Sequence, residues 1–110
     1  MGIAINSKGN ILVSDSGNHI IQEFDSKGKL LSIFGSKGSE NGQFIHPTGI
    51  CIDENDNILI CDHYNDRIQI FNSNRKYITQ FKVNQPTNII INPKTQNIII
   101  CGLDNQVSFF

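Results

Sequence analysis

The chain has 110 residues, enough for one domain, and its nine Lys and Arg against ten Asp and Glu give a net charge of −1. This balance creates no overall field toward nucleic acid or an anionic membrane, and no apolar stretch approaches the roughly 20 residues of a membrane span. Three cysteines without a C-x-x-C pair argue against a disulfide framework and favour a reducing compartment, so we expect a soluble, cytoplasmic chain.

The first predicted unit covers residues 2–34. A short apolar run is followed by a polar turn and ILVSD (11–15), then by a turn and the alternating run IIQEF (20–24), and finally by a turn and LLSIF (30–34). Apolar runs of this length and period, separated by Asn, Asp and Gly, predict four short β-strands joined by tight turns, without a helix.

The second unit, residues 49–82, repeats the first at a constant offset of 47 residues. Fourteen of the 33 aligned positions in 2–34 and 49–81 are identical. Its second run, ILICD (58–62), is apolar throughout, which predicts a strand covered on both faces by neighbouring sheets. Its third run, RIQIF (67–71), alternates and places Gln69 on the face opposite Ile68.

A third copy starts at residue 88, where NIIIN, NIIIC and VSFF stand for GICID, NILIC and IQIF of the second unit. It supplies three more strands, so we predict eleven. Four-stranded units of about 40 to 47 residues that bury their faces against one another are the blades of β-propellers.

The segments GIAINSKGNILVSDSGNHIIQEF and PTGICIDENDNILICDHYNDRIQIF closely resemble the NHL repeat, whose blades read P-x-G-I-x-V-D, G-N-I-Y-V-A-D and N-x-R-I-Q-V-F. FGSKGSENGQFIHPTGI is similar to the linker into the next NHL blade. We therefore predict an all-β, open propeller of about 2.75 blades. Its predicted parts are blade one (2–34), a linker (35–48), blade two (49–82), a linker (83–87) and a partial blade three (88–110).

The chain departs from the NHL pattern at three places. Ile20 stands where Arg67 keeps the Arg of the family. The second linker, KVNQPTN, has lost about eight residues, including G-x-x-G-Q-F, and Gly102 replaces the Asp that ends the second strand of a blade.

The turns between second and third strands carry both repeated and variable residues. Asp15, Asn18, Asp62 and Asn65 recur, and a turn is needed in every blade whereas a catalytic pair is needed once, so we predict structural turn roles for these four. Asp62→Ala should cost about 1 kcal/mol or more of stability through lost turn hydrogen bonds, and Asp15→Ala should cost a similar amount. The variable residues share one end of the propeller with the entering linker. We predict a binding rim there, formed by His19, Lys37, Phe44, His46, His63, Tyr64, Asp66 and Arg67.

Other chemistries find less support. DENDNI (53–58) begins like a calcium loop but lacks the Gly at its sixth position, and the three histidines lack paired zinc-ligand spacing, so no metal or other cofactor is predicted. Cys51, Cys61 and Cys101 are expected to be small core residues. We find no nucleophile triad or phosphate loop, and we expect a non-enzyme.

The NHL resemblance implies a module that binds a protein or peptide through its loop-rich face, within a larger protein such as a ubiquitin ligase. An RNA-binding propeller is the alternative, because some NHL propellers bind RNA through a basic face; a lyase or lactonase would rest on fold analogy alone. The first strand (Ile3, Ile5) and the last (Phe109, Phe110) should be open apolar edges. We therefore expect a fragment of a longer propeller, or a protomer that closes a ring with a second copy.

Overall fold

The computed structural model describes residues 1–110 and contains eleven strands and two 3-10 helices, as the all-β prediction requires. The strands are β1 (Ile3–Ile5), β2 (Ile11–Asp15), β3 (Ile20–Phe24), β4 (Leu30–Phe34), β5 (Pro47–Ile52), β6 (Ile58–Asp62), β7 (Arg67–Phe71), β8 (Tyr77–Lys82), β9 (Pro86–Ile91), β10 (Ile98–Gly102) and β11 (Val107–Phe109). The helices η1 (Ser16–Asn18) and η2 (His63–Asn65) form the β2–β3 and β6–β7 turns, and neither is long or apolar enough to cross a membrane.

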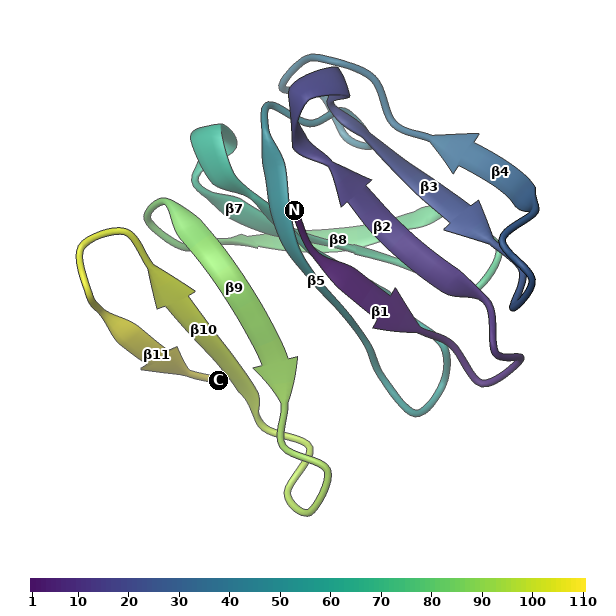
Figure 1. The fold of residues 1–110 in the computed structure, drawn as a ribbon. Coiled ribbons are helices and arrows are strands. Elements are labelled where there is room, and N and C mark those ends of the chain that lie inside the picture. Colours follow the sequence, from purple (N-terminus) through teal and green to yellow (C-terminus); the bar gives the residue numbers. More distant parts are fainter.

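Each repeat unit forms its own antiparallel sheet with strands in sequence order: β1 to β4, β5 to β8, and β9 to β11. The sheets follow one another face to face as blades, and the inner strand β5 contacts both β1 and β9 (Figure 1). β5 and β9 begin two residues before the predicted blade boundaries, because Pro47 pairs with Asp62 and Pro86 with Gly102 across irregular registers. A proline is tolerated as the first residue of a strand.

The middle sheet is covered on both faces. All five residues of β6 are buried. Ile58 and Ile60 belong to the core shared with the first sheet, whereas Leu59 and Cys61 belong to the core shared with the third. The continuous apolar run of β6 therefore has the physical cause that the sequence predicted, since both of its faces lie in a core.

The outer sheets are covered on one face only. We call the face toward the preceding unit the rear and the face toward the following unit the front. In β2, Leu12 and Ser14 on the front are buried, while residues on the rear are partly exposed. The open rear of the first sheet exposes Ile3 (67%) and Ile5 (65%), and the open front of the third exposes Ile90 (55%) and Phe109 (69%). The apolar surfaces predicted as strand edges are thus whole sheet faces.

Two of the sequence predictions for the third sheet need correction. Cys101 is exposed rather than in the core, because no further sheet packs on the front face where it lies. Phe110 is 54% exposed, yet its ring packs against Phe81 of β8 with 5.0 Å between centroids, so it belongs to the interface between the second and third sheets.

The two linkers between sheets differ in length and in what they bury. The first, residues 35–46, inserts Phe44 into the core between the first and second sheets, where its side chain is fully buried. Gly35 has φ +95° and lies so close to the Phe44 ring that a Cβ atom would sit 2.6 Å from it. The second linker, residues 83–85, contributes only the partly buried Val83.

The shortened linker also explains Gly102. A Cβ atom at Gly102 would lie 3.0 Å from the carbonyl oxygen of Asn84 and 3.4 Å from that of Gln85. An aspartate like Asp62 would therefore crowd the backbone of the short linker. The shortened linker thus accounts for the glycine that stands where the other blades have aspartate.

Candidate functional site

Asp62 is the hub of the turn at the end of β6. Its side chain is fully buried and accepts hydrogen bonds from the backbone N–H of Ile45 (2.9 Å) and from the side chains of Asn65 (3.0 Å), Arg67 (2.7 Å) and Gln69 (3.2 Å). It makes no capping bond to the backbone of η2. The predicted structural role thus has another mechanism, because Asp62 joins the linker to β7 rather than closing its own turn.

Arg67 does not face solvent. Only 7% of its side chain is exposed, and besides Asp62 it donates to Gln80 Oε1 (2.8 Å) and to the backbone carbonyls of Glu40 (3.0 Å) and Gln43 (2.8 Å). Phe44 is fully buried. Three residues that the sequence assigned to the rim, Phe44, His63 and Arg67, are therefore buried. The first linker folds over β7, where its carbonyls bind the Arg67 guanidinium, and it carries its own Phe44 into the core.

The equivalent aspartate in the first sheet, Asp15, has fewer hydrogen-bond partners. Asp15 is paired only with Asn18 Nδ2 (2.9 Å), and Ile20 replaces the Arg67 partner. No linker lies over Asp15 and Gln22 as the segment from Gly42 to Ile45 lies over Asp62 and Gln69.

The variable turn residues repeat a second structural role, despite their different chemistry. His19 Nδ1 accepts from the backbone N–H of His46 (2.9 Å), and the equivalent Asp66 Oδ1 accepts from that of Gln85 (2.9 Å). All four residues have positive φ, and His46 and Gln85 each precede the proline that begins the next sheet. Each pair therefore forms a hydrogen bond that fixes the end of a linker to the turn of the preceding blade. We call these two hydrogen bonds the clasps.

A third repeated contact involves the first residue of each 3-10 helix. Ser16 Oγ donates to the carbonyl of Pro47, and His63 Nδ1 lies 3.0 Å from the carbonyl of Pro86, to which it donates. His63 is only 4% exposed. These contacts could not be recognised from the repeat, because hydroxyl, imidazole and carboxylate groups accept or donate the same bond at equivalent positions. The prolines that follow both linkers were the available signal.

The side chain of Tyr64 makes no such hydrogen bond to a linker or strand, and it lies exposed at the centre of the rim. The backbone N–H of Tyr64 donates to the carbonyl of Ile45 (3.1 Å), whereas the side chain is 58% exposed. Its ring centroid lies 4.6 Å from that of His63 and 5.3 Å from that of His46, and the two imidazoles are 5.9 Å apart. We call Tyr64, His46 and His63 the ring cluster.

The ring cluster offers an aromatic surface on a rigid base. Two linker contacts fix its backbone, Ile45 N–H to Asp62 and Tyr64 N–H to Ile45, so little order remains to be gained on binding. A tyrosine here can contribute apolar contact and a phenolic hydrogen bond. Lys37 and Asp66 are exposed elsewhere on the rim.

The cysteines and histidines do not gather into a metal site: the chain has no group of three or more His, Cys, Asp or Glu placed to hold an ion. Burial raises the pKa of Cys61 to about 12, with a contribution from nearby Cys51. Burial, followed by the charge of Asp53, likewise raises the pKa of Cys51 to about 12. Thiols with such pKa values are poor nucleophiles near neutral pH. Asp53, in the segment that begins like a calcium loop, accepts hydrogen bonds from Asn55 and Asn57 of its own turn.

Face-to-face antiparallel sheets with their first strands together define a β-propeller architecture, here open after three blades. The family model for the NHL repeat matches residues 2–24 and 44–71, so these two segments are NHL repeats. Protein brain tumor of Drosophila melanogaster is a relative, 39% identical over 46 residues, which are 42% of this chain and 4% of that protein.

Solved propeller structures support the fold. Hydrazine synthase of Kuenenia stuttgartiensis aligns with a TM-score of 0.76 and 15% identity over 92% of this chain and 28% of that chain. Streptogramin B lyase aligns with a TM-score of 0.67 and 16% identity over 98% and 39%. At such identities the likeness carries the fold alone, and this chain spans well under half of each of these proteins.

Proposed function

We propose that this chain is part of a binding module that engages a protein or peptide through the ring cluster at its loop-rich end. One observation carries the proposal. Tyr64 is 58% exposed on a turn whose neighbouring side chains are hydrogen-bonded to the linkers or to the first residue of β9, and the rings of His46 and His63 support it.

The chemistry of the ring cluster favours a peptide over the alternatives. Rigid, partly exposed tyrosines supply large contact area at a small entropy cost and recur as energetic centres of protein interfaces. Arg67 offers little to RNA, because its guanidinium is buried and already donates to four protein groups. A single exposed tyrosine is a small platform for base stacking. The lyase among the structural neighbours shares the fold at 16% identity, which transfers no activity.

The open sheet faces are a second surface to be filled. The rear of the first sheet presents Ile3, Ile5, Asp15 and Gln22 without a covering sheet or linker. The equivalent residues of the second sheet are covered by the first sheet and its linker; they are Ile50, Ile52, Asp62 and Gln69. Exposed faces of this kind call for other blades. Further blades or a second copy of the chain would serve as their cover.

Phage display of random peptides on the immobilised chain tests the ring cluster. Enriched peptides should bind Tyr64→Ala at least tenfold more weakly, as expected for an aromatic centre worth about 2 kcal/mol. Phe109→Ala, which removes another exposed aromatic ring, on a sheet face, should leave affinity unchanged. Failure to enrich any peptide, or equal binding to the Tyr64→Ala chain, would refute the proposal.

A further inference from the structure

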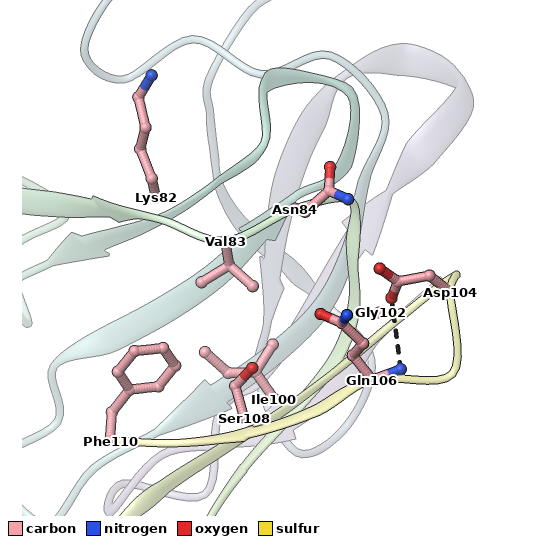
Figure 2. A pocket seen from close by; sticks show the side chains of 9 residues that line it. All are labelled: Lys82, Val83, Asn84, Ile100, Gly102, Asp104, Gln106, Ser108 and Phe110. Atoms are coloured by element: carbon pink, nitrogen blue, oxygen red, sulfur yellow. Dashed lines mark hydrogen bonds between the residues drawn. The ribbon is translucent and has the colours of Figure 1, made fainter.

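A hollow of about 230 Å³ lies at the junction of the second and third sheets, at the loop-rich end (Figure 2). Ile100, Val83 and Phe110 form its apolar wall, and polar groups of the β10–β11 hairpin and of the short linker form the rest. Figure 2 shows Lys82 and Asn84 on one side and Asp104 and Gln106 on the other; the Asp104 carboxylate accepts a hydrogen bond from the Gln106 N–H (3.3 Å).

The repeat identifies what this hollow is. Four of its lining residues occupy positions that, one blade earlier, surround the first linker: Ile100, Gly102, Ser108 and Phe110 correspond to Ile60, Asp62, Gln69 and Phe71.

At that earlier junction the space is filled. The Phe44 ring lies 5.8 Å from the Phe71 ring and is fully buried, and the backbone around it is held by Asp62 and Gln69. The second linker has three residues where the first has twelve, and it brings only Val83 to the equivalent core. The hollow is thus a linker slot whose own linker is too short to fill it.

We propose that this slot binds an extended peptide of a separate partner that carries the chemistry of the first linker: a phenylalanine preceded by small and polar residues. The aromatic side chain would enter beside Ile100 and Phe110, as Phe44 enters beside Ile60 and Phe71.

The positive charge of Lys82 favours a peptide that carries an acidic residue. Lys82 is exposed on the wall and forms no ion pair, and it ends β8 at the position equivalent to Gly35 of the first linker. An acidic residue a few positions before the aromatic, as Glu40 precedes Phe44, would meet this ammonium group at the mouth of the slot. The inference rests on the comparison of the two junctions and is independent of the ring cluster.

The probe for this site is a fluorescent peptide with the sequence of residues 39–47, SENGQFIHP, added to the intact chain. Fluorescence anisotropy should show saturable binding, and a peptide with Phe replaced by Ala should bind at least tenfold more weakly. Val83→Phe should fill the slot from within and weaken probe binding at least tenfold. Tyr64→Ala should not change it, which separates this site from the ring cluster.

Two controls keep the result decisive. Ser108→Leu blocks the slot from the hairpin side and substitutes for Val83→Phe if that chain fails to fold, and circular dichroism melts verify that each variant is native. Absence of saturable binding would overturn the proposal. So would binding that survives both slot-filling variants, because the peptide would then occupy another place, such as the slot of Phe44.

Discussion

Asp15 and Asp62 occupy equivalent positions in the repeat, yet the structure gives them different weights. Asp62 is buried with an ion-paired Arg67 and three further donors, whereas Asp15 has one amide partner. Removing one partner of a buried ion pair leaves an uncompensated charge and typically costs about 3 to 5 kcal/mol, while losing one partly exposed hydrogen bond costs about 1 kcal/mol.

We therefore expect Asp62→Ala to lower the free energy of unfolding by about 3 kcal/mol or more, and Asp15→Ala by about 1 kcal/mol or less. Urea denaturation followed by circular dichroism measures both, with Asp15→Ala as the matched control. Equal losses would mean that the two residues do the same work and that the linker network around Asp62 adds nothing.

The three cysteines should differ in reactivity. Cys101 is exposed, whereas burial raises the pKa of both Cys51 and Cys61 to about 12. At pH 8 the native chain should therefore alkylate with iodoacetamide at Cys101 at least about a hundredfold faster than at the other two, because the thiolate is the reacting form. Peptide mass spectrometry locates the label, and unfolding in urea should equalise the three. Fast native labelling of Cys61 would contradict the described core.

At the scale of elements, the first linker behaves as part of the core between two sheets. Phe44 is fully buried among Leu12, Ile21 and Phe71, so its truncation leaves a cavity in a packed region. We expect Phe44→Ala to destabilise the chain by about 3 to 5 kcal/mol. Phe109→Ala on the open face should change stability by about 0.5 kcal/mol or less. Thermal melts of both variants make the comparison, and a neutral Phe44→Ala would show that the linker is not anchored.

The strands were predictable from sequence because the repeat and the period of apolar residues agree with one another. The continuous apolar run ILICD predicted that β6 is buried on both faces, because a sheet packs against each of them. The accessibility of the rim could not be predicted, since only the fold of the first linker buries Arg67 and carries Phe44 into the core. The clasps of His19 and Asp66 also escaped prediction, because equal geometry is achieved there by unlike side chains.

The open front of the third sheet and the open rear of the first could form a further front-to-rear interface, like the two already formed within the chain. A head-to-tail contact between copies would be such an interface, and it closes a ring if the rotation per chain divides a full turn. We expect concentration-dependent association of the chain in light scattering, weakened by Ile5→Lys on the rear or Phe109→Lys on the front.

Mixing these two variants gives a sharper test of the association. Each retains one native face, so a head-to-tail contact predicts that the mixture regains a dimer that neither variant forms alone. If the unmodified chain stays a monodisperse monomer at every concentration, the open sheet faces do not need a second copy to cover them. Self-association of either variant alone would indicate a symmetric contact instead.

An amide chemical-shift map of the isotope-labelled chain, titrated with a peptide selected on it, locates the binding surface residue by residue. We expect the largest shifts on residues 45–46 and 63–66 around the Tyr64 side chain, and we expect them to vanish in Tyr64→Ala while the spectrum stays native. Shifts confined to the open sheet faces, or shifts that persist unchanged in Tyr64→Ala, would show that the ring cluster is not the binding surface.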